Sequence, residues 1–422
     1  MRISRGTIMF ASAIAFGAVA APPAVQQKVT GPVAVYWVSA GTSSGFGFGG
    51  LGSGQKKPSM GDIMSMMRGG GGRPIHMLEL ALGSSRTATG PEANHLPGTA
   101  TPLPLLTPTQ SPPVRKEEDT RDQPEIKEPP KARILIYWGC GDKAAPGQPY
   151  VLDFSKIMAG QQLPRIPYIA VHHQNPPTTG RYATFGGWPN SKSRDQQVPQ
   201  SLLGDHVVKG NYSPDIKFTL PPGKDWMPPL QLNSGAKSPA GATILQWQSI
   251  PNATGYFATL FGASGEGGRE DGTTIVMWSS SGVQTFADAG LLDYLSPAEV
   301  KRLIGLKLVM PPTATQCTVP VEVTNQTRSG IVSMIAYGDE ANFVDPPRPA
   351  DPKVPWNISW TTKVRYKSTT GLILGMQGGS SATTADDEPY EGRRTIEGQK
   401  APEQPKKKGG LFDKLKGAVS PF

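Results

Sequence analysis

Residues 242–282 read ATILQWQSIPNATGYFATLFGASGEGGREDGTTIVMWSSSG. Leu245 and Trp247 alternate with glutamines, which is the period of a half-buried strand. The aromatic-rich run Tyr256–Phe261 and the segment Thr274–Trp278 predict two further strands, separated by turn residues. This stretch therefore predicts part of a β-sandwich.

Other apolar runs along the chain resemble these strands. Pro32–Trp37 and Arg133–Trp138 both end in tryptophan, as Thr274–Trp278 does, and Ile331–Gly338 has tyrosine in the corresponding place. Their irregular spacing argues against a solenoid repeat. Further strands are predicted at Pro74–Leu82, Pro149–Phe154, Ile166–His173, Asp215–Leu220, Thr318–Thr324 and Trp356–Leu374.

One helix is predicted after this stretch. Ser296 and Glu299 have the spacing of a capping box, with Pro297 at the first helical position. The apolar residues that follow suit a helix of about two turns. The expected fold class is therefore mainly β, with antiparallel β-sandwiches, one short capped helix and long disordered segments.

Composition favours several segments outside any core. The 422 residues include 50 Gly and 43 Pro, an excess typical of turns and unstructured chain. The expected divisions are a signal peptide (1–21), an N-terminal β-rich domain (31–225) with Gly/Met-rich (41–72) and Pro-rich (99–131) insertions, a second β-sandwich (226–377) and a disordered basic tail (378–422).

The spacing of Leu245, Trp247 and Tyr256 resembles strands B and C of fibronectin type III and related immunoglobulin-like domains. The resemblance covers about residues 242–261. It implies that the Trp packs between two sheets and that the Tyr lies on the facing strand. It implies an architecture and no catalytic residues, because a fold alone does not specify a function.

The start of the chain predicts export. Arg2 and Arg5 precede the short apolar run Thr7–Ala20, and Ala18-Val19-Ala20 fits the cleavage rule of a secretory signal. The alternative is an uncleaved anchor. We expect a periplasmic, cell-surface or secreted protein without a transmembrane span in the mature chain.

Two cysteines, Cys140 and Cys317, are present. In an exported protein they permit one disulfide, and the alternative is two buried, unreactive thiols. A third interpretation pairs Cys140 with His172 or His173 as an activated thiol.

Two short motifs have the wrong context for their usual chemistry. Gly41–Gly45 matches the G-x-S-x-G pattern of hydrolases, and Gly45–Gly50 matches a dinucleotide-binding pattern. Both require a helix to follow, whereas the sequence continues with FGFGGLGSG. We interpret them as a Gly/Ser-rich loop and expect no catalytic or cofactor-binding residues there.

Two sets of side chains have the chemistry of metal ligands. His172, His173, Asp205 and His206 have ligand chemistry, but adjacent strand residues point to opposite faces. Methionines between Met60 and Met77, together with His76, have the soft character that Cu(I) prefers. A small apolar patch explains the methionines more simply, so no metal site and no cofactor are expected.

The expected function is a binding or scaffolding role in the bacterial cell envelope, without an identified catalytic constellation. A secreted hydrolase with an unrecognised site and a periplasmic copper-handling protein are the alternatives. The net charge is +9, and Lys406–Lys408 are part of a basic C-terminal tail. Envelope proteins or an anionic surface are therefore the expected partners of this tail, and no nucleic acid is expected.

Overall fold

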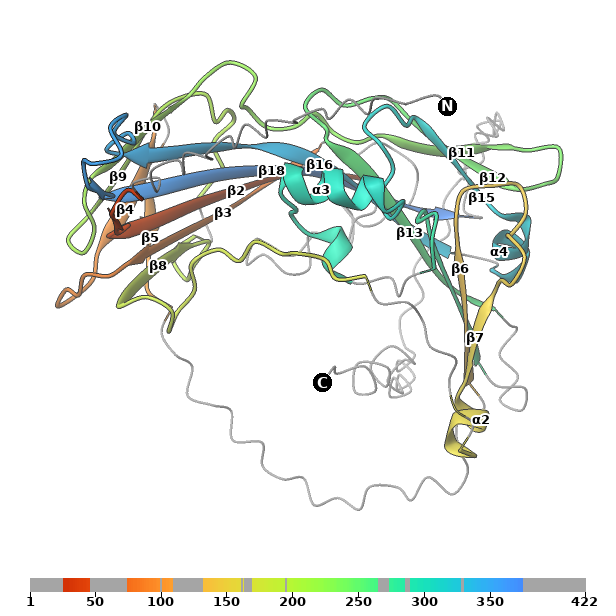
Figure 1. Ribbon diagram of the computed structural model, residues 1–422. Coiled ribbons are helices and arrows are strands. Elements are labelled where there is room, and N and C mark those ends of the chain that lie inside the picture. The colour runs from red at the N-terminus through yellow and green to blue at the C-terminus, as the bar shows by residue number, and fades with distance from the viewer. Residues whose placement is uncertain are drawn as a thin grey trace, which may run out of the picture. The chain divides into compact units, whose positions relative to one another are not determined.

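A large mixed sheet organises the chain in the computed structural model (Figure 1). The structure describes residues 26–45, 74–98, 101–108, 132–160, 162, 169–193, 196–264, 273–284, 289–327 and 330–374. These residues belong to one compact unit. The nine strands of the large sheet lie in the order β7 (Tyr150–Asp153), β6 (Ala132–Trp138), β14 (Thr273–Ser279), β13 (Gly255–Ser264), β16 (Gly330–Asp345), β18 (Trp360–Leu374), β2 (Ala34–Gly45), β3 (Ile75–Ser84) and β8 (Thr184–Trp188).

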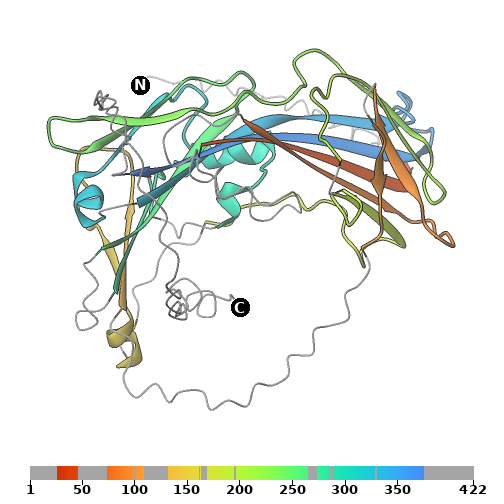
Figure 2. The same cartoon turned by 180° about the vertical axis from the view of Figure 1, so that it is seen from behind.

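Most neighbours in this sheet are antiparallel, whereas β18 with β2 and β14 with β6 are parallel. Its strands come from both of the predicted β-rich ranges, 31–225 and 226–377. The long strands β2, β16 and β18 run side by side, as the view from behind in Figure 2 shows.

Two smaller sheets pack against the same face of the large sheet, which we call the inner face. One contains β10 (Ile216–Leu220), β9 (Gly204–Gly210), β4 (Ala93–Pro97) and β5 (Leu103–Leu105); the other contains β11 (Leu232–Lys237), β12 (Thr243–Trp247) and β15 (Gln316–Val319). Alternate residues of the long strands supply the shared core, as the two-residue period of a strand requires. A short parallel pair, β1 (Val29–Thr30) with β17 (Trp356–Asn357), lies outside these sheets.

The stretch 242–282 divides between two layers. Its first strand, β12, belongs to the three-stranded sheet, and the next two, β13 and β14, form a hairpin in the large sheet. The rings of Trp247 and Tyr256 therefore face each other between layers, with centroids 5.5 Å apart. The three predicted strands and the mainly β class are confirmed.

The opposite, outer face of the large sheet is covered in its middle by helix α3 (Pro297–Gly305), as Figure 1 shows. Ser296 caps this helix by accepting a hydrogen bond from the backbone of Glu299, as the capping pattern predicts. Val300 and Leu303 pack on Phe257 of β13. Two shorter helices, α2 (Phe154–Met158) and α4 (Val321–Gln326), were not predicted.

Several local predictions were wrong. The described part of Ile166–His173 forms no strand, although Ile169 and Val171 pack beside α3. Thr318–Thr324 is a strand only to Val319, and α4 begins after Pro320, which has no N–H to donate to a neighbouring strand. Leu103–Leu105 is a buried strand within the predicted Pro-rich insertion.

Other predictions fall on residues that are not described. These are the signal peptide at 1–21, most of the insertions at 41–72 and 99–131, and the basic tail at 378–422. Across the described ranges, none of the helices combines the length and the apolar character that a membrane crossing requires.

Cys140 and Cys317 form a disulfide with Cα atoms 5.1 Å apart. Cys140 follows β6 in the large sheet, and Cys317 lies on β15 in the three-stranded sheet. The bond therefore joins two layers of the sandwich at one end.

Candidate functional site

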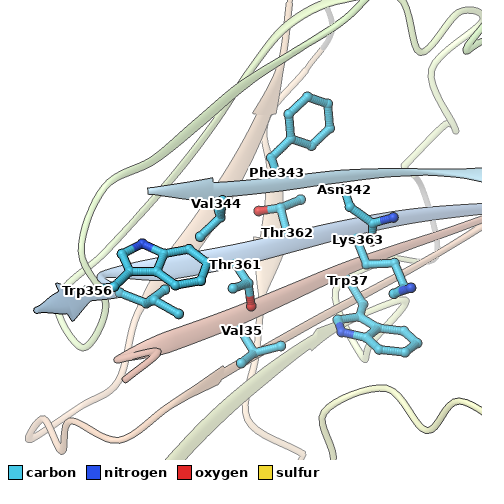
Figure 3. Close-up of a pocket in the computed structure, with 10 residues that line it drawn as sticks. Val35, Trp37, Asn342, Phe343, Val344, Trp356, Thr361, Thr362 and Lys363 are labelled. Atoms are coloured by element: carbon cyan, nitrogen blue, oxygen red, sulfur yellow. The ribbon is translucent and has the colours of Figure 1, made fainter. Parts of the chain in front are cut away.

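A groove of about 430 Å³ lies mainly on the outer face of the large sheet, beyond the part that α3 covers (Figure 3). It crosses β16, β18 and β2, with Trp37 at one side and Trp356 at the other. Such a volume is within the usual range for small-molecule and peptide sites.

The floor of the groove is a row of directly paired residues. Val344 on β16 pairs with Thr361 on β18, and Thr361 pairs with Val35 on β2. All three are β-branched, so they are stiff and form a smooth surface between the two indoles. Figure 3 shows Phe343 pointing to the other side of the sheet.

The next row adds polar groups along one side. Asn342 pairs with Lys363, and Lys363 pairs with Trp37. The Lys363 ammonium is held 2.6 Å from a carboxylate oxygen of Glu340. Since this pair is internally neutral, the groove has no strong preference for an anion or a cation at this position.

Both indoles are positioned by cations. The Arg365 guanidinium lies 5.1 Å from the centre of the Trp37 ring, and Arg348 lies 5.6 Å from that of Trp356. The indole nitrogen of Trp356 also donates to Pro346 O at 2.9 Å. The Lys363 ammonium also lies 5.5 Å from the centre of the Trp37 ring, so two cations contact this indole and fix its orientation.

Arg365 connects the groove to the part of the outer face under α3. Its side chain is only 5% exposed, and Nε donates to Ser39 Oγ at 2.8 Å. The guanidinium stacks between Trp37 and Tyr294, 4.3 Å from the Tyr294 ring. A buried, stacked and hydrogen-bonded arginine is rigid, so the Trp37 wall of the groove is preorganised.

Few hydrogen-bonding groups face the groove. The indole nitrogen of Trp37 has no hydrogen-bond partner among the described residues, and in Figure 3 it lies on the side of the ring toward Val35. The exposed Asn342 amide, the Thr361 hydroxyl and the Lys363 ammonium, which is paired with Glu340, are further polar groups of the groove. The site therefore suits a largely apolar ligand that needs only a few hydrogen bonds.

Of the three interpretations of the cysteines, the structure shows the disulfide, so Cys140 is not a free thiol that a histidine could activate. His172 instead lies at the surface, 69% exposed, with Nδ1 3.1 Å from Glu299 Oε2. Hydrogen bonds from Arg302 are the main cause that lowers the pKa of Glu299 to about 2. This carboxylate is ionised throughout the physiological range and would be a poor general base.

His206 is buried and belongs to a hydrogen-bond network that does not include His172 or Glu299. Its Nε2 lies 2.7 Å from Leu202 O, and its Nδ1 lies 3.1 Å from Nε2 of His95. The Nδ1 of His95 lies 2.7 Å from the hydroxyl of Tyr36. This histidine chain (Tyr36, His95, His206) joins the four-stranded sheet to β2 of the large sheet.

The direction of each hydrogen bond in the histidine chain follows from the carbonyl at its end. Leu202 O only accepts, so Nε2–H of His206 donates and its Nδ1 accepts. His95 then donates from Nε2 and accepts the Tyr36 O–H at Nδ1. Burial lowers the pKa of both imidazoles, and for His95 the neighbouring His206 lowers it further.

Those candidate metal ligands that the structure describes do not gather at one site. Within the described ranges, no three His, Cys, Asp or Glu side chains gather as a metal site would require. The Asp205 carboxylate accepts a hydrogen bond from the Thr219 hydroxyl, and His173 is exposed. Met60, Met64, Met66 and Met67 lie outside the described residues, while His76 stacks on Trp226 at 4.4 Å.

The hydrolase-like motif Gly41–Gly45 lies within strand β2 rather than on a strand-to-helix turn. The groove itself was not predicted. Its one sequence signal is the alternation of Lys363, Arg365 and Lys367 along β18, which puts three cations on one face of a strand. Sequence alone does not show that aromatic side chains from β2 and β17 lie beside them.

Comparisons of this chain with models of protein families, with curated proteins and with solved structures found no match.

Proposed function

We propose that the protein is exported to the bacterial cell envelope and acts there as a binding or scaffolding protein. The signal-like residues at its start support export. The disulfide between Cys140 and Cys317 agrees with it, because such bonds persist mainly in oxidising compartments.

The ligand site of this protein is the groove between Trp37 and Trp356. One observation carries this assignment: two indoles flank a floor of β-branched side chains, Val35, Val344 and Thr361, that remains open on the outer face. Tryptophan is among the residues that dominate binding energy at interfaces. Because Arg365 and Arg348 already hold the two rings, little side-chain entropy is lost on binding.

Site-specific cross-linking in the envelope fraction tests this function. A photo-reactive amino acid replaces Thr361 in the floor of the groove, and the matched control replaces Lys217, an exposed residue of β10. We expect a discrete adduct from position 361, its loss in a Trp37→Ala background, and no such adduct from position 217. Equal labelling from both positions, or labelling that ignores Trp37, would contradict the proposal.

A further inference from the structure

The histidine chain ends directly behind the groove. Tyr36 stands between Val35 and Trp37 on β2, and side chains along a strand alternate between its two faces. Val35 and Trp37 line the groove, whereas the Tyr36 ring points to the inner face. Its hydroxyl lies 2.7 Å from Nδ1 of His95. A movement of Tyr36 therefore reaches the groove through the backbone of β2 itself.

Ring contacts give a second connection between the histidine chain and the groove. Phe343 contributes to the lining of the groove, but its ring points to the inner face, as Figure 3 shows. The centre of that ring lies 5.1 Å from the Phe218 ring on β10, which in turn stacks on His206 at 4.8 Å. The four-stranded sheet thus packs against the inner side of the strands that carry the groove.

The two histidines are enclosed without a buried counter-ion. His95 and His206 are each 2% exposed, and no carboxylate of the described residues hydrogen-bonds to either ring. Asp205, next to His206 on β9, favours a charge there, but it is exposed and its field is screened by water. Near Tyr36 lies the Tyr212 phenol, whose hydroxyl has no hydrogen-bond partner among the described residues. The chain itself must therefore accommodate any added proton.

One added proton reverses the direction of the histidine chain. Protonation turns Nδ1 of His206 into a donor, so Nε2 of His95 has to accept and its proton moves to Nδ1 of the same ring. This Nδ1–H then donates to the Tyr36 hydroxyl, which can no longer donate to His95. Both imidazoles keep their partners, and the O–H of Tyr36 loses its acceptor.

We propose that this proton uptake loosens the groove, so that the protein holds its ligand near neutral pH and releases it in acid. The inference rests on the proposed function, since it names a regulation of the same site. The Tyr36 side chain shifts toward a new hydrogen-bond acceptor. The strand β2 passes this shift on to Val35 and Trp37, which no longer keep the spacing that the ligand requires.

The size and the pH range of the effect follow from the same contacts. A buried hydroxyl that loses its acceptor changes an equilibrium by roughly 5- to 150-fold. We expect the groove to receive part of this, as a fall in ligand affinity of about tenfold. Burial lowers the pKa of His95 and His206, so the change occurs below the ordinary histidine pKa of about 6.5.

Fluorine NMR of the full-length protein tests the movement without a ligand. The tryptophans are replaced by 5-fluorotryptophan, and the Trp37 signal is assigned from a Trp37→Phe variant. The ring signals of His95 and His206 are followed in a matching sample between pH 7.5 and 5. We expect the Trp37 signal to shift with the same midpoint as the two histidines while circular dichroism shows a folded protein.

Ligand release is measured with the photo-reactive amino acid at position 361. Cross-linking in the envelope fraction is carried out at pH 7.5, at pH 5.5 and after return to pH 7.5. We expect the Trp37-dependent adduct to fall about tenfold in acid and to recover afterwards.

Matched variants locate the source of the pH response. Tyr36→Phe removes the hydroxyl and keeps both histidines, so we expect the histidines to titrate while the Trp37 signal stays constant. His206→Gln removes the first proton acceptor and should abolish both responses. His172→Gln is the control, since His172 is 69% exposed and outside the histidine chain, and it should leave the Trp37 titration unchanged. If His206→Gln does not fold, Tyr36→Phe alone decides.

A Trp37 signal that ignores pH while the histidines titrate would overturn the inference. The same holds for an equal titration in Tyr36→Phe, or for histidines that stay neutral until the protein unfolds. A Trp37-dependent adduct whose yield is independent of pH keeps the proposed function and rejects its regulation. No adduct at pH 7.5, together with a titrating Trp37 signal, rejects the proposed function but keeps the movement of the groove.

Discussion

The four-stranded sheet and the three-stranded sheet pack on the same face of the large sheet, but they are attached by different chemistry. The three-stranded sheet is tied through Cys317 to Cys140 and packs through Trp247 and Tyr256. The four-stranded sheet is joined through His95 and His206 to the hydroxyl of Tyr36. We call these the disulfide half and the histidine half.

The difference concerns which conditions each half tolerates. The disulfide half depends on oxidation and not on protons near neutral pH. The histidine half depends on neutral imidazoles, because each ring must both donate and accept within its chain. A fully connected buried polar chain specifies one arrangement of the sheets but loses partners whenever one member changes.

The largest expected effect is the loss of the disulfide. Replacing Cys140 and Cys317 by serine frees an unfolded chain that was closed over 177 residues. The chain-entropy model then predicts a fall of about 5 kcal/mol in the free energy of unfolding. Urea unfolding of the variant at pH 7 measures it, with reduced wild type as the control. An unchanged midpoint in both would show that the bond contributes no stability.

The next effect is expected from His95→Phe in the histidine half. The substitution leaves the Tyr36 hydroxyl and His206 Nδ1 without their partners in a buried site, at a cost of about 3 kcal/mol. Thermal or urea unfolding measures the loss. The control is His76→Phe, which keeps a ring against the partly exposed Trp226 and should cost less than about 1 kcal/mol. Equal losses would argue against a special role for the histidine chain.

Acid should weaken the histidine half selectively. The pKa values of His95 and His206 are lowered in the folded protein, so below about pH 6.5 the unfolded chain binds more protons. Stability is fully present above that pH and falls below it, by up to about 1.4 kcal/mol per pH unit for each proton taken up. Urea unfolding between pH 7.5 and 5 measures the slope.

Two variants sharpen this comparison. The double substitution of His95 and His206 by phenylalanine should remove most of the slope, whereas the double cysteine variant should keep it. The lowered pKa of Glu299 affects stability only in more acidic solution, since that contribution is lost as pH falls from about 4.5 toward 2. A slope that survives the double histidine substitution would assign the proton uptake to other groups.

The smallest effect is expected from removing single hydroxyls. Tyr36→Phe leaves one acceptor on His95 unpaired, and Tyr256→Phe leaves the Ile250 N–H unpaired in the disulfide half. Each should lower the free energy of unfolding by about 1 to 2 kcal/mol. Measuring both under identical conditions shows whether the two halves tolerate a lost hydrogen bond equally. A fall above about 3 kcal/mol for either variant would exceed this mechanism.

Much of the strand content was readable because alternation of apolar and polar residues is local. Asp215–Leu220 was predicted from that period, and β10 occupies Ile216–Leu220. Ser296 was likewise enough to place the start of α3. Ile166–His173 failed because Ile169 and Val171 are buried by α3 without pairing to a neighbouring strand, and the apolar signal reports burial rather than pairing.

The sequence by itself determined the β class, the capped helix and the two cysteines that permit a bond, since each depends on neighbouring residues or on counting. Only the tertiary structure decided that β12 joins a three-stranded sheet and β13 the nine-stranded one, although they are adjacent in the chain. It also decided the groove, where Trp37 and Lys363 meet across more than three hundred residues of sequence. Strand register between distant segments depends on packing of the whole core, and no local pattern encodes it.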